Sequence, residues 1–193
     1  MENSKTYMIA SDIHGSAFWA GRLMDKFEEI KPERLILLGD LLYHGPRNDL
    51  PDEYDPKKVF TLLNRYKDRI TAVRGNCDAE VDQMVLEFPV MADFALLNLN
   101  GIGIFATHGH VYNDTEPGKM PLLGDGDALL FGHIHLPLAE RKAAEEGKPY
   151  YLLNPGSVSI PKGGNPNSYA VLTGRDYRVF DFNGNVLKEI TLQ

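Results

Sequence analysis

Residues 7–14 read Tyr7-Met8-Ile9-Ala10-Ser11-Asp12-Ile13-His14, a short apolar run that stops abruptly at polar residues. Its four apolar residues are typical of a buried strand. A helix is predicted directly after it, because apolar residues recur at helical spacing from a capping serine, Ser16, onward. The recurring residues are Trp19, Leu23, Phe27 and Ile30. A strand followed by such a helix is the first half of a βα unit.

The alternation of strand and helix continues through the first half of the chain. Two further strands are predicted at 35–38 and 70–73, and they end at Gly39-Asp40 and Gly75-Asn76. Between them a second helix is predicted to begin at Asp55-Pro56, with the aspartate as its cap. The order βαβαβ predicts a parallel sheet with helices packed against it.

The second half of the chain is rich in strand signals. A hairpin is predicted from 94–97 and 102–105, because the Asn100-Gly101 pair favours a tight turn. Loops rich in glycine, proline or aspartate are predicted at 43–54 and 112–127. Further strands are predicted at 128–131, 150–153, 169–172, 177–182 and 186–192. The predicted fold class is therefore α/β.

Length and composition predict one domain over residues 1–193. The chain is 43% hydrophobic and 24% charged, close to globular averages. Its net charge of −7 argues against a broad surface for nucleic-acid backbones, and its single cysteine excludes an internal disulfide. No apolar run exceeds four residues, so we expect no membrane span, no signal peptide and a cytoplasmic location.

Each predicted strand of the first half ends in residues that can bind a metal ion. Asp12 and His14 follow the first strand, Asp40 the second, and Asn76 with Asp78 the third. Parallel strands align their carboxyl ends at one edge of the sheet, so we expect these side chains to meet there. One such motif alone is more often a turn, but their repetition predicts a metal site.

Histidines supply the rest of this predicted site. Four of the six histidines form two His-x-His pairs, His108-Gly109-His110 and His133-Ile134-His135. Histidine is the commonest metal ligand, and residues i and i+2 of an extended chain point the same way, so His133 and His135 can face one centre. Glycines at 39, 75, 109 and 132 leave room where the backbone passes close to that centre.

In order and approximate spacing, these motifs resemble the calcineurin-like metallophosphoesterases. The matching motifs are Asp12-x-His14, Gly39-Asp40, Gly75-Asn76-x-Asp78, His108 and Gly132-His133-x-His135. The resemblance covers almost the whole chain, and segments 44–48, 74–78 and 154–166 resemble one bacterial group of phosphodiesterases within the family more closely. For Asn154 to Lys162, the residues alone suggest no chemistry.

The resemblance implies a four-layer α/β/β/α sandwich, with two mixed sheets flanked by helices and two metal ions at the sheet edge. One ion would be held by Asp12, His14, Asp40 and His135. The other would be held by Asp40, Asn76, His108 and His133, so that Asp40 bridges both. This chain carries all seven positions without a substitution.

The reaction implied by the resemblance is hydrolysis of a P–O ester bond by in-line attack of a hydroxide held between the ions. Two divalent ions are offset by two aspartates and the hydroxide, which leaves about one positive charge to attract a phosphate oxyanion. Mn²⁺ is the expected ion. Zn²⁺, Fe²⁺, Co²⁺ and Ni²⁺ also fit, because the ligand set contains no thiolate.

Two residues beside the metal ligands are candidates for supporting roles. Cys77 stands where many relatives carry a histidine that acts as general acid, and a neutral thiol is a weaker proton donor at that place. Asp78 is expected either to hold His14 or another ligand, or to form a plain turn or cap.

Three further residues are candidates for contacting the substrate. His110 is expected either to touch the substrate or to support a metal ligand. Arg47 can grip a phosphate with two hydrogen bonds, and His44 lies in the same loop. The alternative for both loop residues is a solvated surface position.

The favoured function is hydrolysis of a small phosphodiester. A phosphomonoesterase with the same site is the first alternative, but the weak donor Cys77 favours diesters whose activated aryl groups leave with little protonation. A non-catalytic protein-binding scaffold, as in a retromer subunit of this fold, is disfavoured by the complete ligand set. A structural zinc site is disfavoured because the ligands are thiol-free and far apart in sequence. Relatives often form dimers or tetramers, so a homo-oligomer is expected.

Overall fold

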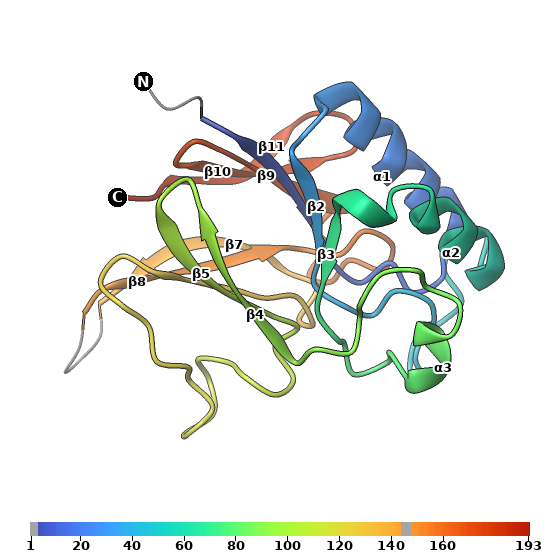
Figure 1. Ribbon diagram of the computed structural model, residues 1–193, viewed down its shortest axis with the longest axis horizontal. Helices are drawn as coiled ribbons and strands as arrows, with labels where there is room; N and C mark the ends of the chain where they lie inside the picture. Colours follow the sequence, from blue (N-terminus) through green and yellow to red (C-terminus); the bar gives the residue numbers. More distant parts are fainter. Residues whose placement is uncertain (1–3, 144–147) are drawn as a thin grey trace.

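The computed structural model describes residues 4–143 and 148–193, which fold into two β-sheets that face each other (Figure 1). The first sheet has the spatial order β11 (Val186–Thr191), β10 (Asp176–Asp181), β9 (Ser168–Thr173), β1 (Thr6–Ala10), β2 (Arg34–Leu37) and β3 (Ile70–Ala72). The second has the order β4 (Phe94–Leu99), β5 (Ile102–Thr107), β6 (Ala128–Leu130), β8 (Tyr150–Pro155) and β7 (Pro137–Lys142). Both sheets mix parallel and antiparallel pairs, which confirms the predicted α/β class.

The first half of the chain forms the predicted βαβαβ unit. β1 pairs in parallel with β2, and β2 with β3, through the crossover helices α1 (Ala17–Ile30) and α2 (Pro56–Asn64). The side chain of Ser16 caps α1 and that of Asp55 caps α2, each by accepting a backbone N–H of the first turn. Both predicted caps are confirmed.

The second half supplies the second sheet and the antiparallel edge of the first. β4 and β5 form the predicted hairpin, and both Asn100 and Gly101 at its turn have positive φ. Three elements were not predicted from the sequence: the edge strand β7, the short helix α3 (Glu80–Gln83) and a 3-10 turn at Lys67–Arg69.

Successive side chains of β1 enter two different cores. Met8 and Ala10 pack with Phe27 of α1 on the helix-covered face of the first sheet. Ile9 packs with Leu130 of β6 in the core between the two sheets. Because both faces of this strand are covered, its sequence is a continuous apolar run instead of an alternating one.

The outer face of the second sheet is covered by a loop. Phe105 and Leu129 lie on this face, and Tyr112 and Leu123 from the 112–127 segment pack against them. In the described ranges no helix follows β4, so this loop replaces the helical fourth layer implied by the family resemblance. Its glycines, prolines and aspartates disfavour a helix. None of the helices described is long and apolar enough to cross a membrane.

Candidate metal centre

Loops that follow β1, β2, β3, β5 and β6 bring the seven predicted metal ligands to one edge of the two sheets. The residues concerned are Asp12, His14, Asp40, Asn76, His108, His133 and His135. Asp12 and Asp40 are only 0% and 2% exposed, whereas Asn76 and His133 reach solvent. Two carboxylates buried this deeply require positively charged partners.

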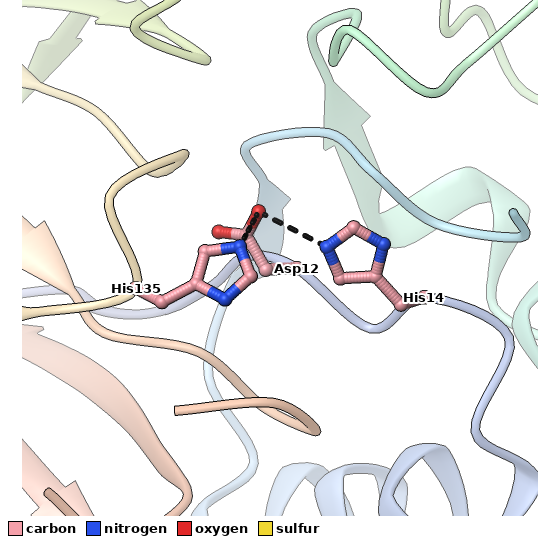
Figure 2. Close-up of side chains that lie close together, drawn as sticks. All are labelled: Asp12, His14 and His135. Atoms are coloured by element: carbon pink, nitrogen blue, oxygen red, sulfur yellow. Dashed lines mark ion pairs between the residues drawn. The ribbon is translucent and has the colours of Figure 1, made fainter. Parts of the chain in front are cut away.

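Three of these residues form one compact group, and Figure 2 shows their side chains pointing toward one another. Oδ1 of Asp12 lies 3.6 Å from Nε2 of His14 and 3.2 Å from Nε2 of His135. Oδ2 of Asp40 lies 3.6 Å from the same nitrogen of His14. The three residues drawn offer ligand atoms that all lie within 4.8 Å of one another, close enough to share a cation.

A second group adjoins the first through Asp40. Its Oδ2 atom lies 3.4 Å from Nε2 of His108. That nitrogen is 3.0 Å from Oδ1 of Asn76 and 3.2 Å from Nδ1 of His133. One oxygen of Asp40 is therefore near imidazoles of both groups.

Backbone carbonyls fix the orientation of three imidazoles. Nδ1 of His14 donates to the carbonyl oxygen of Tyr43 at 2.8 Å. In the same way, Nδ1 of His108 donates to the carbonyl of Leu38 and Nδ1 of His135 to that of Ile160, both at 2.6 Å. A carbonyl can only accept, so each ring carries its proton on Nδ1. In the neutral form of each ring, the lone pair is then on Nε2 and faces the centre, as a metal-ligating histidine requires.

Two buried polar atoms of the first group lack hydrogen-bond partners within the described residues. They are Oδ1 of Asp12 and Nε2 of His14. The two atoms lie 3.6 Å apart, which is too far for a hydrogen bond. Unsatisfied buried polar atoms are rare in folded proteins and call for a ligand or a function. A divalent cation between them would satisfy both, so these residues fit a metal.

Five of the predicted ligands have strained backbone conformations. Among the described residues, eight non-glycine residues have positive φ, and Asp12, His14, Asp40, His133 and His135 are five of them. Left-handed backbone at such residues costs of order 1–3 kcal/mol each and is concentrated at functional sites. The concentration of left-handed backbone at these five residues supports a functional role for the segments that carry them.

The charges of the centre shift its pKa values strongly. Burial alone would raise the pKa of Asp12, but His135 and His14 outweigh it and hold that pKa well below its usual range. Burial opposes protonation of His108, but the carboxylates of Asp40 and Asp12 outweigh it and raise its pKa to about 9. The carboxylates thus attract positive charge, which a divalent cation can supply.

Two of the predicted glycines are required where the backbone passes the ligands. A Cβ on Gly75 would lie 2.0 Å from Oδ1 of Asp40. A Cβ on Gly132 would lie 1.9 Å from Oγ of Ser11 and 3.0 Å from Oδ2 of Asp12. The prediction that these glycines leave room beside the centre is confirmed.

Asp78 holds the backbone around Asp40. Its carboxylate accepts the N–H groups of Asp40 and Leu41, each at 2.8 Å, and of Gly75 at 2.7 Å. It does not bond His14, whose ring is held by the Tyr43 carbonyl instead. Asp78 therefore contacts the main chain around Asp40 and not the ring of His14.

A cleft of about 350 Å³ opens above these ligands. Arg47, the predicted phosphate-binding residue, lines it, and so do Cys77 and Lys162. Lys162 was not predicted as a site residue, because it follows Asp12 by 150 positions in the chain and belongs to no motif with recognisable chemistry. Two cationic side chains thus face the cleft beside the buried carboxylates.

The Asn154 to Lys162 segment forms hydrogen bonds with the backbone and with one histidine of the centre. Oγ of Ser157 and of Ser159 donate to the carbonyl of Asp12 at 3.0 and 3.1 Å. The Ile160 carbonyl holds His135, and the side chain of Asn154 donates to the Gly132 carbonyl at 2.8 Å. Ser157 and Ser159 are two residues apart, and in an extended chain this spacing lets both side chains point the same way. That spacing was the only signal for this role in the sequence.

Cys77 is held beside Asp40 as a protonated thiol. Its backbone N–H donates to Oδ1 of Asp40 at 2.7 Å, and the Asn76 amide donates to its sulfur at 3.2 Å. Burial, followed by the negative charge of Asp40, raises the pKa of the thiol to about 12. At neutral pH it is neither a nucleophile nor a strong proton donor.

The two remaining predicted residues do not line this cleft. His44 packs between Tyr43 and Tyr54, with ring centroids 4.8 and 5.1 Å away. His110 lies beside His108 and lines a neighbouring cavity of about 500 Å³. Burial and the positive charge of nearby histidines lower the pKa of His110 to about 4, so this ring is neutral. His44, a candidate for contacting the substrate, lies outside the set of residues that line the metal cleft.

Comparison with known proteins gives consistent matches. A family model described as the calcineurin-like phosphoesterase superfamily domain matches residues 6–176. Phosphodiesterase YfcE of Escherichia coli K12 is 48% identical over 165 residues, which cover 86% of this chain and 85% of that protein. Probable metallophosphoesterase YsnB of Bacillus subtilis is 30% identical over 192 residues, which cover 95% of each protein.

Solved structures agree with these sequence matches. The structure of the E. coli phosphoesterase YfcE superposes with a TM-score of 0.91 at 42% identity, covering 97% of this chain and 100% of that chain. Vps29 of Chaetomium thermophilum superposes with a TM-score of 0.57 at 18% identity, covering 97% and 98%. At this low identity, the similarity to Vps29 shows a shared fold and nothing more.

Proposed function

The chain belongs to the calcineurin-like phosphoesterase superfamily, and we propose that it is a single-domain phosphodiesterase that works with two divalent cations, preferably Mn²⁺. The shared position of one carboxylate oxygen supports this proposal most directly. Oδ2 of Asp40 lies 3.6 Å from Nε2 of His14 and 3.4 Å from Nε2 of His108. These imidazoles belong to different ligand groups, so one oxygen can serve two cations.

Seven side chains would hold the cations. One cation would be held by Asp12, His14, Asp40 and His135, and the other by Asp40, Asn76, His108 and His133. Neutral imidazoles combined with carboxylates and no ligating thiolate suit borderline divalent ions. When bound, the cations supply Lewis-acid chemistry that activates water and polarises the phosphoryl oxygens for in-line displacement.

The chain's own cationic residues position the substrate. Arg47 and Lys162 line the cleft above the ligands. The Arg47 guanidinium would bind two phosphoryl oxygens, and the Lys162 ammonium would contribute a point charge. Asp78 and Ser157 act through the backbone and hold the ligands in place.

The neutral thiol of Cys77 favours diesters over monoesters. An ester that expels a poor alkoxide depends on a strong proton donor, whereas an activated aryl diester needs little protonation of its leaving group. A diester also brings one negative charge to the site, where a monoester dianion brings two. A thiol beside Asp40 is a weaker donor than the imidazole that many relatives carry there. The relatives that are 48% identical to this chain over 165 residues are named phosphodiesterases, which supports the same choice.

Comparison of two aryl substrates tests this function. With Mn²⁺ bound, kcat/KM for bis(p-nitrophenyl) phosphate should exceed that for p-nitrophenyl phosphate. Chelation should abolish hydrolysis, and Mn²⁺ should restore it. A higher kcat/KM on the monoester, or full activity of protein stripped of metal, would contradict the proposal.

A further inference from the structure

An apolar groove of about 380 Å³ adjoins the metal cleft. The two share one lining residue, Cys77. The other residues of the groove are Leu42, Tyr43, Tyr54, Pro56, Phe60, Ala79, Val81, Asp82 and Val85. They come from the loop after β2, from the start of α2 and from the region of α3, which lie on one side of the molecule (Figure 1).

The groove and the cleft have opposite chemical character. The cleft is lined by ligand side chains and by Arg47 and Lys162. The groove contains one charged side chain, Asp82, whose carboxylate accepts the N–H of Ala79 at 2.8 Å. Apolar side chains are nevertheless left open to solvent there, since Tyr43, Val81 and Val85 are 41%, 62% and 37% exposed. An apolar hollow beside a charged centre is typical of a binding site.

The aromatic wall of the groove is fixed in place. His44 packs edge-on against both Tyr43 and Tyr54, with interplanar angles of 66° and 81°. The backbone carbonyl of Tyr43 also accepts from His14 of the metal centre at 2.8 Å. The wall is therefore connected rigidly to the centre, and a group that lies in the groove has a defined position relative to it.

We infer that this groove is the subsite for one ester group of the substrate, and that this group is a flat aromatic ring. The inference rests on the proposed phosphodiesterase function. A phosphodiester carries two ester groups beside its phosphorus, so a phosphate bound in the cleft places one of them within reach of the adjoining groove. Tyrosine and phenylalanine side chains contact an aromatic ring favourably, and the volume falls near the lower end of the range for ligand pockets, about 300–1,000 Å³.

Two diesters of equal charge test this inference by binding rather than by turnover. Diphenyl phosphate and dimethyl phosphate are titrated calorimetrically into the Mn²⁺-loaded protein. Diphenyl phosphate should bind about tenfold tighter or more, because one ring leaves water and enters the groove. Hydrolysis of bis(p-nitrophenyl) phosphate is measured on the same sample, so that failure of the proposed function is seen separately.

Val81→Asn and Met84→Asn form a matched pair of variants. Val81 lines the groove, whereas Met84, 83% exposed and three residues further along, is not among the lining residues. Val81→Asn should reduce the advantage of diphenyl phosphate at least about threefold, leave the affinity for dimethyl phosphate unchanged and keep the oligomeric state. Met84→Asn should change none of these.

Equal affinities of the wild type for both diesters would overturn the inference. So would an unchanged diphenyl advantage in Val81→Asn. A shift of Val81→Asn to a smaller oligomer, with both affinities altered together, would identify the groove as a contact between copies of the chain and would also overturn it.

Discussion

At the scale of single residues, Asp40 is fixed from several directions. Oδ2 faces His14 and His108, and Oδ1 accepts the N–H of Cys77. The backbone N–H of Asp40 donates to Asp78. Burial would raise the pKa of Asp40, but the neighbouring His108 outweighs it and lowers that pKa, so the side chain stays ionised. An ionised, immobile carboxylate is what a bridging ligand requires.

Asp40→Asn should therefore keep the fold and lose more than nine-tenths of the activity. Removing the bridging charge should cost more than about 1.4 kcal/mol of transition-state stabilisation. The measurement is kcat/KM on bis(p-nitrophenyl) phosphate, with circular dichroism to check folding. Asp25→Asn, at an exposed position of α1, is the matched control. Retention of more than a tenth of the activity by Asp40→Asn would contradict the bridging role.

Substitutions of Cys77 should separate the two reactions. Cys77→Ala should lower kcat/KM on an aryl diester by less than about threefold, because the N–H that holds Asp40 remains and the thiol is a weak acid. Cys77→His should raise the rate on an alkyl phosphate monoester, whose poor alkoxide leaving group depends on a proton donor. Loss of diester hydrolysis in Cys77→Ala would make the thiol a direct participant.

The candidate ligands could be selected from the sequence, but their backbone conformations could not. Asp12, Asp40 and the histidines stood at strand ends with recognisable spacing. Their positive φ values depend on bonds from distant segments, such as the N–H of Asp12 to the carbonyl of Gly39 and the N–H of Ser159 to the carbonyl of Asp12. Local sequence carries no signal for such contacts.

At the scale of elements, the helices were predicted correctly where apolar residues recur at helical spacing and a capping residue precedes them. α1 and α2 have both, and they begin at the predicted residues. β7 was missed because its second half, Glu140 to Lys142, is charged, as befits an edge strand. α3 has only four residues, too few for a helical period to appear. The Asn154 to Lys162 segment was missed because its partners lie far along the chain.

Ser157 tests how much this segment contributes. Its Oγ is buried, donates to the carbonyl of Asp12 and accepts the N–H of Ile160 at 3.0 Å. Ser157→Ala should lower the free energy of unfolding by about 1–3 kcal/mol, because buried backbone groups lose partners. Urea unfolding measures this. The control is Thr191→Ala, which removes an exposed hydroxyl bonded to Asp176. Equal effects of both substitutions would show that the segment has no special supporting role.

At the scale of the whole molecule, the two sheets create the site by placing their strand ends at one edge. β1, β2 and β3 of the first sheet meet β5 and β6 of the second there. Neither sheet alone carries a complete ligand set, so the site depends on the packing between them. The oligomeric state and the cytoplasmic location remain predictions, as does the choice of Mn²⁺.

Metal binding should stabilise the whole fold. Without cations, the buried carboxylates of Asp12 and Asp40 face unsatisfied ligand atoms and a strained backbone. A ligand that binds only the folded state raises its stability by mass action. Mn²⁺ should therefore raise the thermal midpoint, and chelation should lower it, with a smaller shift in Asp40→Asn. An equal shift in both proteins would place the stabilising ion elsewhere.

The central claim is that one chain holds two neighbouring cations with Asp40 between them. Anomalous diffraction at the manganese absorption edge, from crystals grown with Mn²⁺, tests it most directly. Two adjacent peaks are predicted, one beside Asp12, His14 and His135 and the other beside Asn76, His108 and His133. A single peak, with Asn76 and His108 outside its coordination sphere, would contradict the claim.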